Sequence, residues 1–325
     1  MTSLSQARGW LHLKLWKRAV HAFCGRLYRD SNADPTRSVM VAGTARSGTT
    51  WLAEIIASQM ASRIMFEPFH SRLVPAFSGF HYFQYMHPEE QNDELLAYCA
   101  RVFTGTIRHR WIDREVEHIF PTYRIIKEIR ANLFLKWIRI RFPQVPLLLI
   151  LRHPCAVVSS RMQLGWATDE DIEPFLAQPR LVHDFLEDKL DIIRSAQSPE
   201  EKHAVIWCVS YLIPLQQLQA GEATLVCYER LCSEPEREVP RIFHGIGLGY
   251  RASLFSRLHQ PSKTTVSHSP VMRGHGRIGR WTRELSPSQI RRILTVVDRF
   301  GLGSLYGDSL APTELVTPGP AGELG

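Results

Sequence analysis

Short apolar runs alternate along the chain with segments whose apolar residues recur at helical spacing. The short runs predict strands at residues 38–42, 63–66, 123–127, 146–152 and 223–228. The periodic segments predict helices at 49–60, 93–103, 131–142, 154–162, 181–196, 200–220, 236–246 and 288–300. Strands that alternate with helices favour βαβ units, and the wholly apolar run at 146–152 is typical of a strand buried on both faces. We therefore predict an α/β fold with a central, mostly parallel sheet flanked by helices.

The two ends of the chain depart from this pattern. Residues 1–36 are basic and amphipathic, and residues 8–28 predict a helix that lies on a membrane surface or, alternatively, docks on its own domain. Residues 309–325 are rich in Pro and Gly, which predicts a disordered tail. We therefore predict that residues 37–308 form the folded domain.

Composition and charge narrow the classes of function. Lys and Arg number 39 against 32 Asp and Glu, a net charge of +7, which favours anionic partners. No dense basic run is interleaved with aromatics, so we expect no nucleic-acid partner. The six cysteines form no CxxC pair and no zinc-like cluster, so we expect reduced thiols. No apolar run is long enough for a membrane span, and the N-terminus lacks the apolar core of a signal peptide. We expect a cytoplasmic protein, with residues 8–28 as its candidate contact with a membrane.

The stretch VMVAGTARSGTTWL at residues 39–52 has the layout of a phosphate-binding loop. A predicted strand runs into Gly43, and Gly48 opens a predicted helix, so that backbone N–H groups can form an anion cradle. The lysine of ATP-binding and GTP-binding loops is missing, because Thr49 and Thr50 follow Gly48 directly. Arg46 can supply the missing positive charge as a planar fork.

A second stretch, LLLILRHPCAVVSSR at residues 147–161, changes the expected ligand. In a nucleoside triphosphatase a strand of this kind ends in Asp, which holds Mg²⁺. This strand ends in Arg152, and Ser160 follows two helical turns later, so both side chains can reach one phosphate. The site therefore offers positive charge in place of a metal-binding carboxylate, and we expect no metal.

Together, GTARSGTTW and LRHPCAVVSSR resemble the two nucleotide-binding signatures of the sulfotransferases, whose donor is 3′-phosphoadenosine-5′-phosphosulfate (PAPS). The resemblance covers roughly residues 38–281 and implies a P-loop NTPase-like sulfotransferase fold for residues 37–308. It implies that the phosphosulfate is held by Arg46, Ser47, Gly48, Thr49 and Thr50. Arg152 and Ser160 keep the spacing of the pair that holds the 3′-phosphate. Trp51 would pack near the adenine, and Tyr228 of VCYERL would match the family's adenine-side tyrosine.

The FEP motif at residues 66–68, with arginine in the first loop, looks more like the carbohydrate sulfotransferases than the cytosolic phenol and steroid enzymes. In the enzymes that it resembles, this motif carries the catalytic glutamate, which implies Glu67 as the base. Lys127 of IIKEIR fits the family's strand-end lysine and would stabilise charge on the transferred group. The histidine base of the cytosolic branch would stand two residues later, where this chain has Ile129. The reserve candidates for the base are Glu128 and His70.

Two further segments are expected near the site. In SPVMRGHGRIGRWTREL, residues 269–285, Gly276, Gly279 and Trp281 keep the GxxGxW part of the family's nucleotide-covering segment, while its Arg-Lys pair is replaced. Substitutes for that pair are Arg273, Arg277 and Arg280, unless the segment is only a solvated basic turn.

The long loop at residues 70–90 is rich in aromatics, which either stack on the acceptor or pack the loop against the core. These aromatics are Phe77, Phe80, Tyr82, Phe83 and Tyr85.

The sequence thus predicts in-line transfer of a sulfuryl group from PAPS to a hydroxyl of a small-molecule or glycan acceptor. Such a transfer needs positioning and charge stabilisation more than covalent catalysis. Two alternatives are an atypical P-loop kinase of small molecules and a non-catalytic protein that binds PAPS or glycans.

Overall fold

The computed structural model describes residues 27–30, 32–166, 169–258, 260, 278–307 and 309–310, with the side chains of residues 169–171 left aside. Several predictions lie outside these residues. They are the helix over most of 8–28, the roles of Arg273, Arg277 and Gly276, and the tail after residue 310.

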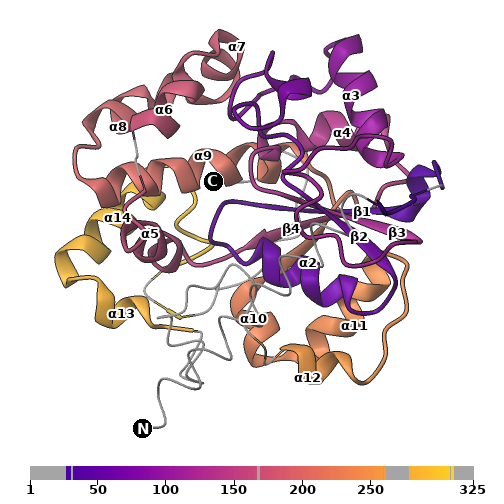
Figure 1. The fold of residues 1–325 in the computed structure, drawn as a ribbon. Coiled ribbons are helices and arrows are strands. Elements are labelled where there is room, and N and C mark those ends of the chain that lie inside the picture. The colour runs from indigo at the N-terminus through magenta and orange to yellow at the C-terminus, as the bar shows by residue number, and fades with distance from the viewer. Residues whose placement is uncertain are drawn as a thin grey trace, which may run out of the picture.

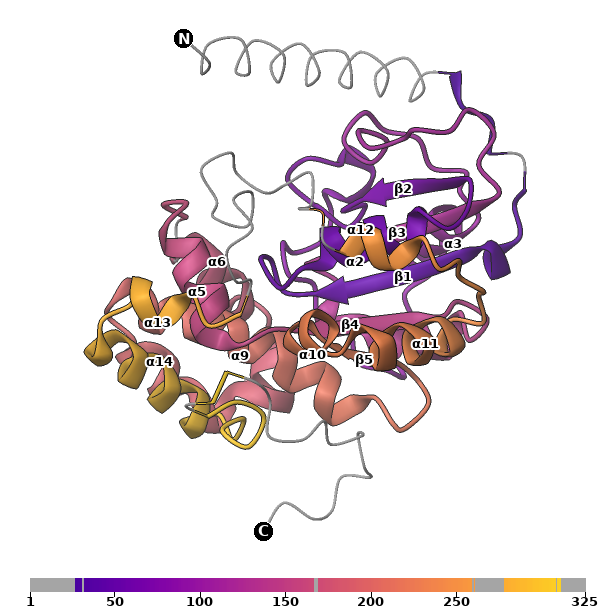
Figure 2. The ribbon, with the colours of Figure 1, turned by 90° about the horizontal axis from the view of Figure 1, so that it is seen from below.

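Five parallel strands form one sheet in the order β2-β3-β1-β4-β5. The strands are β1 (Ser38–Gly43), β2 (Ser62–Phe66), β3 (Tyr123–Glu128), β4 (Leu147–Leu151) and β5 (Thr224–Cys227). Figure 2 shows the arrowheads of β1 and β2 pointing the same way. The predicted α/β fold with a parallel central sheet is confirmed, and each predicted strand forms with small shifts at its ends.

Helices cover both faces of this sheet (Figure 1). They are α2 (Thr49–Ala57), α3 (Asp93–Phe103), α4 (Leu135–Arg141), α5 (Pro154–Met162), α6 (Asp169–Leu176), α7 (Pro179–Leu181), α8 (Leu190–Ser195), α9 (Pro199–Gln217), α10 (Tyr228–Ser233), α11 (Pro235–Gly245), α12 (Leu254–Leu258), α13 (Trp281–Glu284) and α14 (Pro287–Arg299). Side chains of successive strand residues point to opposite faces of the sheet, so the hydrophobic core consists of two clusters, one on each face. Met40 and Ala42 face the larger cluster with α3, α4, α5, α9 and α14, whereas Val39 and Val41 face α2, α10, α11 and α12.

The predicted continuous helix at residues 181–196 is wrong. The chain instead passes from α7 through a π-helical turn, Val182–Leu186, and a 3-10 turn, Glu187–Lys189, before α8 begins. Leu181 and Leu186 are both fully buried. Because they are five residues apart, the wider π-helical turn places both on the side that faces the core, which a regular α-helix would not do.

The sheet edge at the amino ends of β2 and β3 contains a buried ion network. Arg63 and Arg124 lie opposite each other in the strand register, and both are almost completely buried. The Asp30 carboxylate accepts from Arg124 Nε at 2.7 Å and from Arg63 Nη1 at 3.3 Å, and Asp113 Oδ1 accepts from Arg63 Nη2 at 2.8 Å. Like charges directly opposite each other destabilise a sheet, so these carboxylates are needed at this edge.

Replacing Asp30 with Ala should lower the free energy of unfolding by about 3–5 kcal/mol, because it leaves two buried guanidinium groups short of a partner. Denaturant titration followed by circular dichroism measures the change. The control is Asp188→Ala, whose side chain is 73% exposed beside Lys189 and should change stability by less than about 1 kcal/mol. Equal midpoints for the two variants would contradict this role for Asp30.

Candidate active site

The predicted phosphate loop joins β1 to α2 at the centre of the sheet. Gly48 is the N-cap of α2, has a φ of 104° and carries no side chain that could cap the helix. A Cβ atom at this position would lie 2.7 Å from Cδ2 of Tyr228. Glycine is therefore required both by the left-handed backbone and by the close approach of the ring. The open N-terminus of α2 leaves backbone N–H groups available for an anion.

Arg46 links the two stretches that the sequence singled out. Its Nε donates to Ser160 Oγ at 2.9 Å, and its carbonyl oxygen accepts from Arg152 Nη1 at 2.9 Å. The structure thus brings Arg46, Arg152 and Ser160 together. Burial, followed by the nearby Arg152 cation, lowers the pKa of Arg46. In the described part of the chain neither guanidinium group forms an ion pair, so the loop presents two uncompensated positive charges.

Aromatic side chains form a wall beside these cations. Trp51 on α2 and Tyr228 at the start of α10 meet edge to face, with ring centroids 5.3 Å apart. The Arg152 guanidinium lies 4.4 Å from the centroid of the Tyr228 ring. The predicted adenine-side residues Trp51 and Tyr228 therefore lie against each other and against the predicted phosphate-binding Arg152.

Residues that the sequence analysis missed hold the loop in place. The Thr44 N–H donates to Tyr211 Oη at 3.2 Å, and that hydroxyl donates to the Ile150 carbonyl at 2.8 Å. Arg161 Nη2 donates to Thr44 Oγ1 at 2.7 Å, and Ser47 Oγ donates to the Thr44 carbonyl at 2.7 Å. Ser47 therefore stabilises the loop from within. Arg161 directly follows Ser160 in the second stretch, whereas no local signal points to Tyr211.

A second cluster lies at the carboxyl ends of β2 and β3. Glu67 directly follows β2, and its N–H donates to the Lys127 carbonyl at 2.8 Å. Its carboxylate accepts from Lys127 Nζ and, at 2.6 Å, from Arg130 Nη1. All three residues are buried. Arg130 stands three residues after Lys127 in IIKEIR and was not among the predicted site residues.

Two opposing effects set the charge of this cluster. Burial alone would raise the pKa of Glu67, but the Lys127 and Arg130 cations outweigh it and lower the pKa to about 2. Burial lowers the pKa of Lys127, while contact with Glu67 favours its ammonium form. For Arg130 the attraction of Glu67 exceeds the effect of burial and raises its pKa. We therefore treat the cluster as one carboxylate held between two cations.

The reserve candidates for the base occupy different environments. Glu128 is fully buried and accepts backbone N–H groups from Phe69, Ile129 and Arg130 at 3.0, 2.7 and 2.9 Å. Its carboxylate is thus engaged in shaping the backbone. His70 lies between the rings of Tyr82 and Trp111, with centroid distances of 5.3 and 5.4 Å. Burial and the Arg130 cation lower the pKa of His70 to about 4, so its imidazole is neutral at pH 7.

The strand order places the two clusters side by side. β3 pairs with β2 on one side and with β1 on the other, and Ala42 lies opposite Glu128. In a parallel sheet all carboxyl ends meet at one edge, where ligands of open α/β sheets bind. Among the described non-glycine residues, Arg46 and Glu67 alone have a positive φ, at 72° and 46°. Such strained backbone is concentrated at functional sites.

The aromatic loop mainly supports the core. Phe77, Phe83 and Tyr85 are buried in the larger cluster, and Phe80 stacks on Phe77 with centroids 4.6 Å apart. Tyr82 differs, because it is only partly buried and its hydroxyl accepts from Arg130 Nη2 at 2.6 Å. Of the five aromatics proposed for the acceptor, Tyr82 is therefore the one that contacts the Glu67 cluster.

The late segment is described only from residue 278 onward. Trp281 stacks on His153, with ring centroids 4.4 Å apart and an interplanar angle of 16°. Nδ1 of His153 also accepts from the Cys155 N–H at 3.2 Å, which caps α5. Arg280 forms an ion pair with Glu284. Of the three candidate arginines here, Arg280 is thus already paired within its own helix region.

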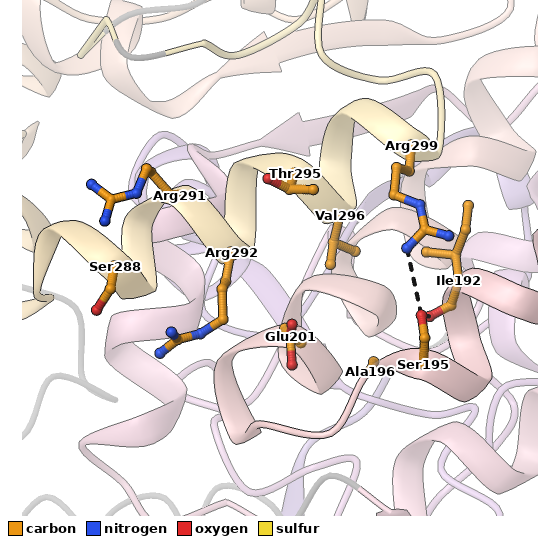
Figure 3. Close-up of a pocket in the computed structure, with 10 residues that line it drawn as sticks. All are labelled: Ile192, Ser195, Ala196, Glu201, Ser288, Arg291, Arg292, Thr295, Val296 and Arg299. Atoms are coloured by element: carbon orange, nitrogen blue, oxygen red, sulfur yellow. Dashed lines mark hydrogen bonds between the residues drawn. The ribbon is translucent and has the colours of Figure 1, made fainter.

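A separate pocket of about 380 Å³ lies between α14 and the junction of α8 and α9 (Figure 3). Three arginines line it, but Arg292 is paired with Glu200 at 2.8 Å, and Arg299 contacts Ser195 Oγ at 3.5 Å. Its lining contains neither an aromatic ring nor a residue of the phosphate loop. We therefore place the candidate chemistry at the carboxyl edge of the sheet.

The described residues contain no group of three His, Cys, Asp or Glu side chains placed to hold a metal ion. Among the same residues, no helix combines the length and the apolar character needed to cross a membrane.

Comparison with known proteins identifies relatives of the chain. The sequence model of the Sulfotransferase family matches residues 38–252. No curated protein matches the chain. Among solved structures, a sulfotransferase from Alicyclobacillus acidocaldarius is 12% identical, with 81% of this chain and 93% of that chain covered and a TM-score of 0.40. The sulfotransferase domain from the curacin biosynthetic pathway is 12% identical over 80% of this chain and 96% of that one, with a TM-score of 0.44. Mouse sulfotransferase SULT7A1, solved in complex with PAP, is 12% identical, with 86% of this chain and 88% of that chain covered and a TM-score of 0.42.

The lowered pKa of Glu67 predicts a pH dependence of stability. Because the pKa falls from 4.5 in the unfolded chain to about 2 in the folded one, the contribution of Glu67 is complete above about pH 4.5 and is lost as the pH falls toward 2. Unfolding free energies of the wild type and Glu67→Gln, measured across this range, should converge by roughly 3 kcal/mol at low pH. A constant difference between the two proteins would contradict the buried ion cluster.

Proposed function

The chain belongs to the sulfotransferase family, and we propose that it transfers a sulfuryl group from PAPS to a hydroxyl of a carbohydrate, glycolipid or other small-molecule acceptor. One observation carries the choice of donor. Arg46, which lies two residues before the open N-terminus of α2, donates to Ser160 and accepts from Arg152, and neither guanidinium has a carboxylate partner in the described part of the chain. Such a site fits a ligand with several negative charges.

The proposed positions of the donor follow from this arrangement. The loop N–H groups, Arg46 and the hydroxyls of Thr49 and Thr50 hold the phosphosulfate, as the family resemblance implies. Arg152 and Ser160 hold the 3′-phosphate. Binding there requires the Arg46–Ser160 contact to open, which frees the Ser160 hydroxyl for the phosphate. Trp51 and Tyr228 provide the aromatic side of the nucleotide site.

The proposed reaction is an in-line displacement at sulfur. The acceptor oxygen forms a bond to sulfur while the bond from sulfur to the 5′-phosphate oxygen breaks, which leaves 3′,5′-ADP. The acceptor proton passes to the Glu67 carboxylate, and Lys127 stabilises the charge on the transferring group. A carboxylate with a pKa near 2 is a weak base. When Lys127 turns toward the sulfuryl group, Glu67 loses one of its two cations, and its pKa rises during the transfer.

We assign the chain to the carbohydrate type within the family. The support is the FEP motif, the arginine in the first loop and the position of Glu67 between Lys127 and Arg130. Ile129, buried after β3, takes the place of the histidine base of the cytosolic branch.

We further propose a cytoplasmic location, in which residues 8–28 form the candidate membrane contact. The support is chemical, because Cys99, Cys208 and Cys227 of the described residues are buried free thiols, as in a reducing compartment.

Nucleotide binding separates this proposal from a kinase. 3′,5′-ADP at one hundred times its Kd should stabilise the protein by about 2.7 kcal/mol in a thermal-shift assay, whereas Mg-ATP should give a much smaller shift. Arg152→Ala should abolish most of the shift. Arg291→Ala, which removes an arginine of the remote pocket, should retain it. A larger shift with Mg-ATP than with 3′,5′-ADP would overturn the proposal in favour of a kinase.

Turnover separates an enzyme from a non-catalytic binding protein. Glu67→Gln and Lys127→Ala should each lower the rate of transfer from labelled PAPS by about a hundredfold or more, while the 3′,5′-ADP shift persists. Glu236→Gln, at an exposed position on α11, is the matched control and should react normally. Full activity in Glu67→Gln would remove Glu67 from the mechanism, and no transfer by the wild type to any acceptor would favour a binding protein.

A further inference from the structure

We infer that the acceptor is anionic, and that Arg114 binds its carboxylate, sulfate or phosphate group beside the reacting hydroxyl. This inference rests on the proposed function and adds the chemical class of the acceptor to it.

The ring of Phe66 connects Arg114 to the reaction centre. Phe66 directly precedes Glu67, and Lys127 Nζ lies 4.4 Å from its ring centroid. The Arg114 guanidinium lies at the same distance, 4.4 Å, from the centroid of the same ring. The two cations thus share one aromatic side chain. An acceptor whose hydroxyl reaches Lys127 and Glu67 can therefore place a neighbouring group at Arg114.

Arg114 is both oriented and accessible. Its guanidinium also lies 4.6 Å from the ring centroid of Trp111, so the Phe66 and Trp111 rings together orient the guanidinium plane. Its side chain is 39% exposed. The Glu115 carboxylate lies 3.4 Å from Nε and leaves the two terminal nitrogens of the fork for a bidentate contact. The Arg114 side of this 3.4 Å pair is exposed to solvent, so an anionic ligand can compete for the guanidinium.

The polar groups around Arg114 also favour a ligand. Trp111 Nε1, His70 Nδ1 and Arg130 Nε are buried in the described structure without a hydrogen-bond partner. These residues are connected, since His70 contacts the Trp111 and Tyr82 rings and Arg130 contacts Tyr82. Buried polar atoms are rarely left unpaired in native proteins unless a site or a water requires them. Here they lie beside the proposed acceptor position.

The charge balance selects an anion. Lys127, Arg130 and Arg114 bring three positive charges to this group of rings, and Arg72 adds a fourth, 4.1 Å from the Tyr82 centroid. The opposing carboxyl groups are Glu67, Glu115 and the fully buried Glu128. Positive charges therefore outnumber negative ones, and an acid group on the acceptor would restore the balance.

The pocket in Figure 3 is a second arginine-lined surface at which an anionic group could bind. There Arg292 is paired with Glu200, and Glu201, which also lines the pocket, closes the capping box at the start of α9. That pocket lies far along the chain from Phe66 and contains none of the residues at the carboxyl edge. Its exposed Arg291 supplies a matched control for the loss of one positive charge.

Acceptors that differ only in charge test the inference. Each charged acceptor in the panel is compared with a neutral partner. An aryl glucuronide is compared with its glucuronamide, and para-hydroxybenzoate is compared with para-hydroxybenzamide. The 6-sulfate and the 6-phosphate of an aryl glucoside are each compared with the parent glucoside. Transfer from labelled PAPS gives kcat/KM for each, and calorimetry with the protein saturated in 3′,5′-ADP gives binding. At least one charged member should exceed its neutral partner by about tenfold. This ratio should fall toward one in Arg114→Ala, recover in part in Arg114→Lys and persist in Arg291→Ala.

The results distinguish failure of this inference from failure of the proposed function. The 3′,5′-ADP thermal shift, measured on the same samples, reports the donor site, and its absence in the wild type would count against the proposed function. If that shift is present and no charged member binds or reacts better than its neutral partner, the inference is overturned. It is also overturned if Arg114→Ala keeps the full ratio, or if Arg291→Ala loses it. The three kinds of charged acceptor separate a preference for carboxylate, sulfate or phosphate.

Discussion

Lys127 and Arg130 lie three residues apart at the end of β3, and at that depth their charges would repel each other without a carboxylate between them. Glu67 supplies it from the neighbouring strand. Its backbone is held at a φ of 46°, a conformation that costs of order 1–3 kcal/mol. The pairing of β2 with β3 sets the position of this residue, so the ion cluster and the strand register depend on each other. The loop that contains His70 and Tyr82 then packs over the cluster.

The order of strands divides the site into two parts. β1, β4 and β5 end in the phosphate loop, Arg152 and Tyr228, which together form the proposed nucleotide side. β2 and β3 end in Glu67 and Lys127, the proposed transfer side. The two sides meet where β3 pairs with β1. One sheet edge thus presents the positive charges of Arg46 and Arg152 on one side and the Glu67 carboxylate on the other.

Much of this arrangement is predictable from the sequence because its signals are local. Apolar runs mark the strands. The spacing of Gly43 and Gly48 marks the phosphate-like loop, and the spacing of Arg152 and Ser160 marks the second stretch of the proposed donor site. Other contacts have no local signal. Tyr211 supports Thr44 across 167 residues of chain, and the pairing of Arg130 with Glu67 requires knowledge of which strands are neighbours. The break in the helix at residues 181–196 likewise depends on how two leucines meet the core.

The division of the sheet edge has an evolutionary consequence. Every residue proposed for the acceptor lies between Phe66 and Arg130, whereas the proposed donor residues come from β1 with α2, from the end of β4 with α5 and from the start of α10. Mutation of side chains in this segment that lie outside β3 can therefore alter the proposed acceptor site without changing the strands that hold the proposed donor site. A lineage built on this sheet can diversify its products by varying one continuous stretch of the gene while selection holds the remainder constant.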